Sequence, residues 1–443
     1  MRHSLLTIET SPHSLPAQVD VAIIGAGAAG IATAYALSSS GVSVAVFEKG
    51  TVAAEQSSRN WGWCRTLGRD LRELPMAKLS VDLWRNLQAQ TGVDAGFMQT
   101  GVAFVTDDAR ELAVWEKWLE VARREGVPAR MLSRREANAT HAWRNEPWIG
   151  GIRTETDGYA EPARAIPLLA QHLLGRGVLI FQQCAVNELL TEAGKVAGVR
   201  TELGTVRAAK VVLAGGAWSS LFCRKHRLPL PILRVESSAS ASSAFDAGGA
   251  APVRAPAFAF RPREDGSLLL AKSGRGTIHV EPDLLRYAFR FQAMYRARKG
   301  KVSVKFGRRF FSQAWEEFRY LHLGNAPFSR NRILDPLPDM ALVRQAYLDA
   351  QPSLSGLGPQ LIDSAWGGTI DNTPDGIPVV SDVKRLPGLY LCTGFSGHGF
   401  SSSMGAGRAL AELLVGSNPS FDLKPFVYER LTDGPPPHPS LLY

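Results

Sequence analysis

The sequence predicts an α/β protein with a Rossmann-like dinucleotide-binding domain and a second domain that binds the substrate. Three observations carry this prediction. A strand–glycine loop–helix–strand pattern occupies residues 19–47, an acidic residue ends its second strand, and the chain has 443 residues of which 45% are hydrophobic. A chain of this length forms two or three domains of ordinary size, and this share of apolar residues can build large cores.

The N-terminal pattern is that of a pyrophosphate-binding loop. Residues 19–24 read as a buried strand, residues 31–37 as a helix and residues 42–47 as a second strand, with Gly25, Ala26, Gly27, Ala28, Ala29 and Gly30 in the loop between. The three glycines allow a tight turn, a close approach to the pyrophosphate and close helix packing. Free N–H groups at the helix start attract phosphate, and Glu48 can accept hydrogen bonds from ribose hydroxyls. An acid at this position argues against NADP but leaves NAD and FAD open.

Charge is unevenly distributed along the chain. The formal net charge is +9, and much of the excess lies between residues 286 and 319, which we predict to be helical and amphipathic. This basic stretch is either a solvated helix face or a surface that docks a partner or RNA. We do not expect nucleic acid to be the main partner.

The sequence gives no sign of export or of a membrane span. No apolar run reaches the roughly 20 residues that cross a bilayer, and residues 1–18 lack the apolar core of a secretory signal. The four cysteines form no CxxC pair, so we expect neither a disulfide framework nor a metal site. We therefore expect a cytoplasmic protein.

Later segments resemble the D-amino-acid oxidase superfamily, which includes glycine oxidase, sarcosine oxidase, D-amino-acid dehydrogenase and γ-glutamylputrescine oxidase. In chain order they are Gln-Ser-Ser-Arg-Asn-Trp-Gly-Trp at 56–63, Thr-Asp-Gly-Tyr-Ala-Glu-Pro at 156–162, Val-Val-Leu-Ala-Gly-Gly-Ala-Trp-Ser at 211–219, Asp-Asn-Thr-Pro-Asp-Gly-Ile-Pro at 371–378 and Thr-Gly-Phe-Ser-Gly-His-Gly-Phe at 393–400. The last block is similar to the family's Gly-x-x-Gly-His-Gly motif, which leads into a helix aimed at the flavin pyrimidine ring. The matches run from residue 19 to about 407, in family order.

The resemblance implies FAD and an interleaved fold. A Rossmann-like FAD-binding domain of the glutathione-reductase type would alternate with a substrate domain built on an antiparallel sheet with helices. We expect the FAD-binding domain at 17–80, 151–230 and 355–430, the substrate-binding domain at 81–150 and 231–354, and tails at 1–16 and 431–443.

The glycine loop and the resemblance together assign the cofactor contacts. Besides the six loop residues 25–30, they are Glu48, Lys49, Ser57, Ser58, Arg59, Asn60, Gly62, Trp63, Val186, Ala214, Gly215, Trp218, Gly367, Gly394, Ser396, Gly397, His398 and Gly399. Members of the family tether FAD through a cysteine before Thr-Pro-Asp or a histidine in the N-terminal loop. Both are missing here, at 366–373 and at 49–71, so we predict non-covalent FAD.

The implied reaction is oxidation of a C–N bond by hydride transfer to flavin N5, which gives an imine that hydrolyses. The flavin carries the difficult chemistry, and the protein supplies position and charge. Neither a catalytic base nor a proton-transfer role for His398 is required. Lys272 resembles a lysine that helps sarcosine oxidases react with oxygen, or it is a solvated lysine at a strand end. Arg65 would pair with a substrate carboxylate, or form a structural ion pair.

Tyr159 and Arg261 are further candidates for contact with the substrate, and Tyr159 is also a candidate catalytic residue. Trp61 and Trp63 replace smaller residues of the family loop and either wall the site or pack in the core. Ser401 stands where sarcosine oxidases have a lysine that holds the substrate carboxylate, which argues against sarcosine as the substrate.

Three functions remain open on the sequence. The protein is a free-standing amine or amino-acid oxidoreductase, with oxygen or a quinone or electron-transfer partner as acceptor. Alternatively it is the FAD subunit of a hetero-oligomeric opine- or proline-type dehydrogenase, or a tRNA-modifying flavoprotein.

Overall fold

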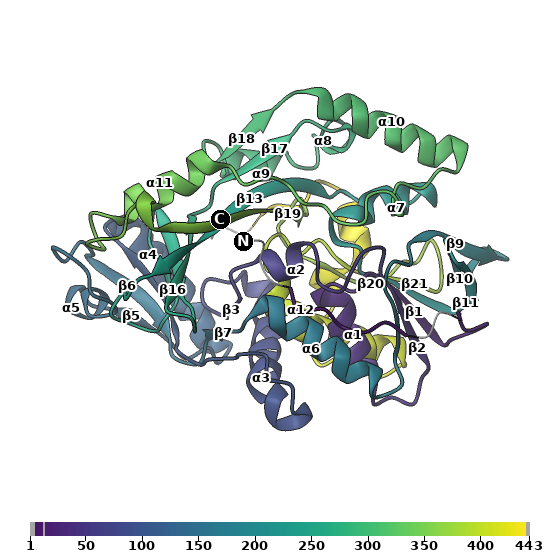
Figure 1. The fold of residues 1–443 in the computed structure, drawn as a ribbon, viewed down its shortest axis with the longest axis horizontal. Helices are drawn as coiled ribbons and strands as arrows, with labels where there is room; N and C mark the ends of the chain where they lie inside the picture. The colour runs from purple at the N-terminus through teal and green to yellow at the C-terminus, as the bar shows by residue number, and fades with distance from the viewer. Residues whose placement is uncertain (1–4, 12–13, 440–443) are drawn as a thin grey trace.

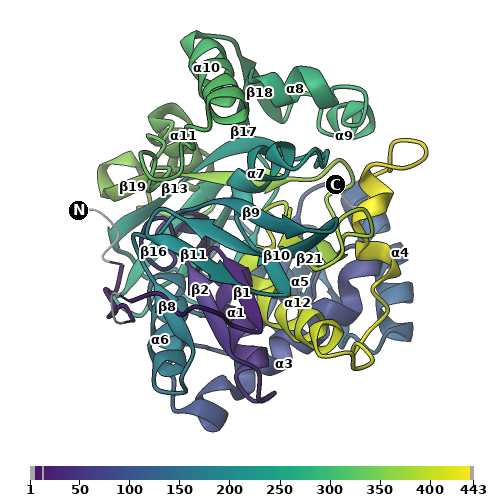
Figure 2. The same cartoon turned by 90° about the vertical axis from the view of Figure 1, so that its right-hand side faces the viewer.

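The protein is built around two large β-sheets with helices packed on them (Figures 1 and 2). A computed structural model describes residues 5–11 and 14–439. Parts of the two predicted tails, at residues 1–4, 12–13 and 440–443, lie outside the described residues.

The first sheet has six strands in the order β20-β21-β12-β1-β2-β8. Five of them run parallel and β20 pairs antiparallel with β21 at the edge. The strands are β1 (Val21–Ile24), β2 (Val44–Phe47), β8 (Leu179–Phe181), β12 (Lys210–Leu213), β20 (Val379–Asp382) and β21 (Leu389–Thr393). Their central strands are apolar on both faces, because helices cover one face and further chain covers the other.

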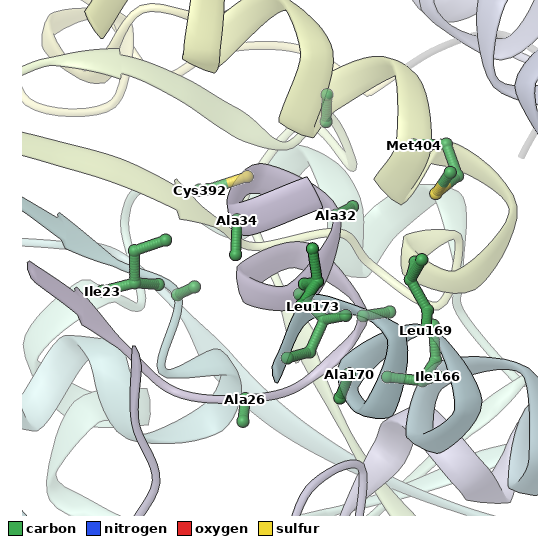
Figure 3. Packing of buried hydrophobic residues seen from close by; sticks show 14 of the residues in the cluster. Ile23, Ala26, Ala32, Ala34, Ile166, Leu169, Ala170, Leu173, Cys392 and Met404 are labelled. Carbon is green, nitrogen blue, oxygen red and sulfur yellow. The ribbon is translucent and has the colours of Figure 1, made fainter. Parts of the chain in front are cut away.

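Small residues let the helices of this sheet pack closely (Figure 3). The helices are α1 (Ala28–Leu37), α3 (Leu74–Thr91), α6 (Pro162–Leu174) and α12 (Gly399–Leu414). A Cβ on Gly407 of α12 would lie 2.6 Å from the Ala32 carbonyl carbon of α1. Only glycine fits this crossing, and side chains such as Leu169, Leu173 and Met404 fill the space around it.

The second sheet has ten strands, in the order β18-β17-β13-β16-β15-β14-β4-β6-β5 with β19 paired to β13. Most pairs are antiparallel, but β4 with β14 and β17 with β18 are parallel, so this sheet is mixed rather than purely antiparallel. The strands are β4 (Val102–Thr106), β5 (Ala129–Leu132), β6 (Gly150–Thr154), β13 (Leu233–Ala244), β14 (Val253–Arg254), β15 (Phe258–Pro262), β16 (Ser267–Lys272), β17 (Gly276–His279), β18 (Val302–Lys305) and β19 (Ile362–Asn372).

Smaller elements complete the fold. A three-stranded antiparallel sheet is formed by β9 (Val186–Glu192), β10 (Lys195–Thr201) and β11 (Gly204–Arg207), and β3 (Trp63–Cys64) pairs with β7 (Gly158–Tyr159). The helices α2 (Gln56–Arg59), α4 (Ala109–Arg124), α5 (Arg134–Asn138), α7 (Ser219–Lys225) and α11 (Met340–Ala350) complete the two layers.

Three elements cross the expected domain boundaries. Strand β6 begins at residue 150 and β19 at residue 362, yet both belong to the mixed sheet rather than to the parallel one. Helix α3 extends beyond residue 80 and packs on α12, through Val81, Trp84 and Leu87 of the core beside the parallel sheet. The chain therefore passes between the two sheets at different points from those that the motifs suggested.

Residues 282–323 form a segment that we call the outer segment (Figure 2). It contains α8 (Pro282–Tyr287), α9 (Gln292–Ala297), β18 and α10 (Arg308–Leu323). The prediction of helix over 286–319 is wrong at residues 302–305, which form a strand. Gly300 turns the chain with a φ of 79°, and the β-branched Val302 and Val304 then favour pairing with β17.

The described parts of the predicted tails contact the body of the protein. The Ser11 N–H donates to the carbonyl of Ile180 in β8, and the Arg290 guanidinium donates to the carbonyls of Thr432 and Gly434. Within residues 5–11 and 14–439, no helix is long and apolar enough to cross a membrane.

The crossing of α1 and α12 gives a test in which two effects have opposite signs. Alanine is favoured over glycine in a helix by about 1 kcal/mol, but Gly407→Ala would press a methyl group onto the α1 backbone. We expect Gly407→Ala to lower the free energy of unfolding by about 1–3 kcal/mol and to reduce FAD content. Chemical denaturation measures the first and absorbance the second. The matched control is Gly175→Ala, where a Cβ has room; a Gly407→Ala protein as stable as wild type would contradict this packing.

Candidate active site

Two adjoining cavities lie at the edge where both sheets contribute residues. The first, the loop cavity, is lined by the β1–α1 loop, the ends of β2, β12 and β21, and the start of α12. The second, the sheet cavity, has a volume of about 600 Å³ and is lined mainly by strands of the mixed sheet and by residues 56–69 and 396–401. Gln56, Asn60, Gly397 and Phe400 line both, so the cavities meet there.

The β1–α1 loop is held in shape by its own glycine and by a buried acid. Gly25 has a φ of 102°, and a Cβ on it would lie 2.5 Å from the Ala214 carbonyl oxygen. The Glu48 carboxylate accepts hydrogen bonds from the N–H groups of Ala26 (2.9 Å) and Gly50 (2.7 Å). Burial raises the pKa of Glu48, an effect that these two N–H donors oppose. The loop is thus preorganised around an acidic group at the cavity wall.

The loop before α12 is fixed in a similar way from the other side. The Asp371 carboxylate accepts hydrogen bonds from the Gly394 N–H (2.7 Å) and the Thr393 hydroxyl (3.3 Å). Burial raises the pKa of Asp371 to about 6. The N-cap residues, Gly27 of α1 and His398 of α12, make no side-chain cap hydrogen bond, and the Ser57 hydroxyl accepts from the Ala28 N–H of α1 at 2.9 Å. Two positive helix ends therefore face the loop cavity, an arrangement suited to an anionic group.

Most of the cofactor residues predicted from the sequence line one of the two cavities. The loop cavity has Gly25, Gly27, Ala28, Ala29, Glu48, Lys49, Ser57, Asn60, Val186, Ala214, Gly215, Trp218, Gly397 and Gly399. The sheet cavity has Arg59, Trp63, Ser396 and His398. Ala26, Gly30, Ser58, Gly62, Gly367 and Gly394 line neither. A Cβ on Gly367, for example, would meet the Pro336 carbonyl at 2.4 Å, so this glycine serves packing rather than the cavity.

Sequence reasoning missed several residues of the loop cavity. Glu55 accepts hydrogen bonds from Lys49 (2.6 Å) and from the Trp218 indole (3.1 Å), and so ties two predicted residues together. Phe222 and Phe328 close the wall beside Trp218. The nearness of Glu55 to the Gln-Ser-Ser-Arg-Asn segment was an available signal, but nothing in the sequence indicated Phe328.

The sheet cavity is strongly cationic. Its lining includes Arg59, Arg65, Arg69, Arg254, Lys272, Arg275, Arg298 and Lys301, whereas Glu111 is the one carboxylate among the described lining residues. Arg59, Arg254 and Lys272 have carboxylate partners: Asp335 at 2.6 Å, Glu111 at 3.0 Å and Asp349. The excess of positive charge in the lining makes this cavity suited to an anion.

Two predicted residues of this cavity are held in defined positions. The Arg65 N–H donates to the Ser401 hydroxyl at 3.0 Å, and the Arg65 guanidinium donates to the Leu67 carbonyl and lies 5.5 Å from the Phe104 ring centre. The Lys272 ammonium pairs with Asp349, while burial lowers the pKa of Lys272, with a smaller effect in the same direction from Arg275. Trp61 and Trp63 line the cavity with their rings 5.5 Å apart.

The placement of Arg261 and Tyr159 does not fit the expectation of substrate contact. Neither lines the sheet cavity. The Arg261 side chain is fully buried, donates to both Glu161 carboxylate oxygens (2.6 and 3.2 Å) and stacks over the Tyr159 ring at 4.5 Å. Burying a guanidinium requires such pairing, so these residues act as a structural cluster behind the wall.

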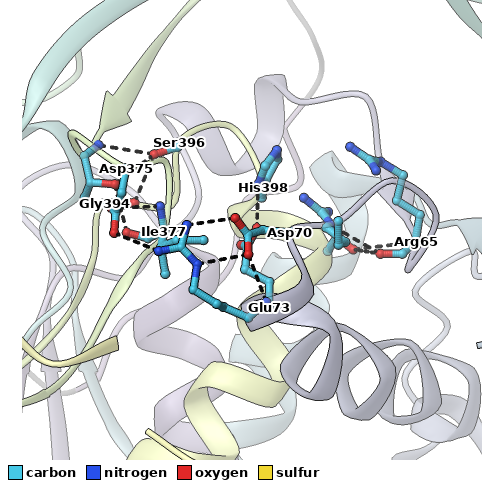
Figure 4. A network of polar contacts seen from close by, with 12 residues as sticks. Arg65, Asp70, Glu73, Asp375, Ile377, Gly394, Ser396 and His398 are labelled. Atoms are coloured by element: carbon cyan, nitrogen blue, oxygen red, sulfur yellow. Dashed lines mark hydrogen bonds and ion pairs between the residues drawn. The ribbon is translucent and has the colours of Figure 1, made fainter. Parts of the chain in front are cut away.

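His398 contacts a buried acid next to the cavity (Figure 4). Its Nδ1 lies 3.5 Å from the Glu73 carboxylate, which is fully buried. Burial raises the pKa of Glu73 to about 7, and Arg69 opposes that effect. Burial and the nearby arginines hold the pKa of His398 well below its usual range. A neutral imidazole therefore stands at the start of α12, in keeping with a contact role rather than proton transfer.

A family comparison assigns this fold and site to a class. The family described as FAD dependent oxidoreductase, the DAO family, matches residues 20–413, so the chain belongs to it. This match confirms the family resemblance, and the likeness to solved structures confirms the predicted fold class. The loop cavity fits the cofactor, because the starts of two helices and a close-approaching glycine loop suit its pyrophosphate.

Individual relatives are similar over nearly the whole chain. L-amino acid deaminase from Proteus myxofaciens has a TM-score of 0.91 at 26% identity, covering 97% of each chain. Sarcosine oxidase subunit beta from an Arthrobacter species is 26% identical over 94% of this chain and 91% of its own length. 4-methylaminobutanoate oxidase (formaldehyde-forming) from Paenarthrobacter nicotinovorans is 24% identical over 93% of this chain, which spans only 46% of that relative's length.

The buried Glu73 predicts a dependence of stability on pH. Its pKa is raised to about 7 in the folded protein from an ordinary value of 4.5, so the folded state holds the proton more tightly than the unfolded chain does. Stability therefore falls as pH rises from about 4.5 to about 7 and then levels off. We expect the difference in free energy of unfolding between Glu73→Gln and wild type to shift by about 2–3 kcal/mol in favour of the variant when the pH is raised from 5 to 8. Urea unfolding at both pH values measures this. An equal difference at the two would show that Glu73 does not titrate as stated.

Proposed function

We propose that the protein oxidises the Cα–N bond of an α-amino acid whose acidic groups are held by the sheet cavity. The observation that carries this proposal is the excess of arginine and lysine side chains in a cavity that adjoins the loop cavity. One cation suffices for an α-carboxylate, and this cavity has several more. We therefore extend the proposal to amino acids that carry a second acidic group, on the side chain or on a nitrogen substituent.

The residues that would hold FAD follow from the loop cavity. The β1–α1 loop would bind the pyrophosphate, Glu48 the ribose, and the start of α12 the flavin ring, near Gln56, Asn60, Gly397 and Phe400. Bound there, FAD supplies a hydride acceptor for a carbon that carries a neutral amine. We assign no covalent tether for FAD among the described residues near this junction, so FAD would bind non-covalently.

The chain's own residues would position the amino acid. Arg65, fixed by Ser401 and Phe104, would bind a carboxylate, and Arg254 or Arg275 would bind the second acidic group. Trp61 and Trp63 would limit water around the amine. Because the substrate amine reacts neutral, no side chain is assigned as a catalytic base. The imine product would then hydrolyse in water to a keto acid, with release of ammonia or, from an N-substituted amino acid, of the primary amine.

Relatives support an amino acid over a simple amine. L-amino acid deaminase and glycine oxidase are both named for amino-acid substrates. Polyamines, which are cationic, would be repelled by the lining. The electron acceptor is either oxygen or a quinone or protein partner. The role of Lys272 toward oxygen stays a prediction, and the structure pairs the Lys272 ammonium with Asp349.

A substrate panel tests the proposal directly. We expect an anaerobic panel of D- and L-amino acids to bleach the flavin band of the holoprotein, with kcat/KM for glutamate or an N-carboxyalkyl amino acid at least about tenfold above that for a neutral isostere such as glutamine. Putrescine is the matched cationic control. Bleaching by neutral amino acids alone would support amino-acid oxidation but overturn the proposed preference for a substrate with a second acidic group. Bleaching by putrescine alone would overturn the proposal.

Arg65 gives a second test of the same site. Removing a charged hydrogen bond to a carboxylate costs about 1.5–3 kcal/mol, so Arg65→Gln should lower kcat/KM by about tenfold to a hundredfold, mainly through KM. Stopped-flow reduction of the flavin measures both constants. The control is Arg110→Gln, which removes an exposed arginine at the start of α4. An unchanged KM in Arg65→Gln would show that Arg65 has only a structural role.

A further inference from the structure

The outer segment exposes an unusual number of large apolar side chains. Its exposed members are Leu285, Phe289, Tyr295, Val304, Phe306, Phe311, Trp315, Phe318 and Leu323, with between 45% and 70% of each residue accessible. Scattered exposed apolar residues need no explanation, but a concentration of them marks an interaction surface.

Helix α10 contacts the protein through charged side chains and the buried Tyr320, and it turns a stripe of aromatic side chains outward. Arg309 pairs with Glu236 and Glu281, and Glu317 pairs with Arg224 at 2.6 Å and with Arg286 at 2.6 Å. Phe311, Trp315 and Phe318 are spaced by four and three residues, which places them on one stripe of the helix, and all three are exposed. A helix that only covered the protein would carry polar side chains on this outward stripe.

The exposed rings of this helix contact one another. Phe311 lies 5.4 Å from Phe310 and 6.2 Å from Phe306, measured between ring centres. Trp315 stacks on Phe318 at 5.6 Å, and Phe318 lies 5.0 Å from His322. We call this set, with Phe306, Phe311, Trp315 and Phe318 as its exposed members, the aromatic face.

Positive charge flanks the aromatic face. Arg308 and Arg319 occupy positions on α10 next to the stripe, and Arg296, Lys299 and Lys305 are further cations of the outer segment. The carboxylates of the described α10 are turned to the protein, because Glu316 accepts from Asn331 at 2.9 Å and Glu317 is held by arginines. The outward side of α10 therefore combines aromatic rings with cations.

We propose that the aromatic face docks the protein on the surface of an anionic phospholipid bilayer, with α10 lying parallel to the membrane. Aromatic side chains would enter the interface between headgroups and acyl chains, and the arginines and lysines would contact the phosphates. The helix has 16 residues and does not span. RNA fits less well, because bases stack on open ring faces, whereas Trp315 and Phe318 cover each other's faces.

The outer segment also reaches the sheet cavity. Arg298, Lys301 and Val302 line that cavity, while α10 of the same segment carries the aromatic face. Docking would therefore place the membrane on the same segment that borders the substrate site.

Vesicle sedimentation tests the proposal with the full-length FAD-loaded protein. The probes are vesicles of phosphatidylcholine alone and of phosphatidylcholine with phosphatidylglycerol in equal amounts. We expect binding to the anionic vesicles, weakened by added salt. The double substitution Phe311→Ser with Trp315→Ser should reduce the partition coefficient at least about tenfold, and Arg308→Ala should reduce it less. The matched control is Leu203→Ser, an exposed leucine in the β10–β11 turn, which should bind as wild type.

The flavin spectrum and thermal unfolding of each variant show that it is folded. Retained binding by the Phe311→Ser, Trp315→Ser protein, or wild-type protein that stays in the supernatant with anionic vesicles, would overturn the proposal. So would a wild-type dimer that this double substitution converts to a monomer, because a second copy would then cover the face. Salt-sensitive RNA binding lost in the same variant, without vesicle binding, would assign the face to RNA instead.

Discussion

The close contact between α1 and α12 is the constraint on which the rest of the site depends. Gly407 lets α12 lie against the backbone of Ala32, and this brings the starts of both helices to one cavity. Each start is preceded by a loop that a buried acid holds, Glu48 at one and Asp371 at the other. A wider separation of the two helices would leave two half-sites, each too weak to bind a dinucleotide.

Both cavities receive positive charge, by different means. Helix N-termini supply partial positive charge to the loop cavity, and guanidinium groups supply full charge to the sheet cavity. The buried groups between them are arranged so that they add little charge, since His398 is kept neutral and Glu73 titrates near neutrality. The sheet cavity therefore attracts anions through its excess of cationic side chains, with Glu111 as the one carboxylate among its described lining residues.

The sequence predicted what is local and missed what depends on distant elements. The glycine loop, Glu48 and the block before α12 are contiguous motifs, and most of their residues line the loop cavity or the adjoining sheet cavity. Arg254, Arg275, Arg298 and Lys301 come from separate elements, and alternation along a strand cannot tell which face meets a cavity. For the same reason the sequence could not show that Arg261 pairs with Glu161 instead of lining the sheet cavity. The sheet to which β6 and β19 belong depends on pairing with distant strands, which no local pattern reports.

The threading of the chain has a consequence for its synthesis. Strand β1 pairs with β12, β12 pairs with β21, and β13 pairs with β19 along its length, so strands made early wait for partners made much later. Such long-range pairing slows folding and leaves apolar surface open meanwhile. The apolar helix α1 is complete near the start of translation, yet α12, which covers it, emerges near the end. A nascent chain of this topology keeps apolar surface exposed until its final segments appear, and a truncation that removed β19 to β21 would leave both sheets unfinished.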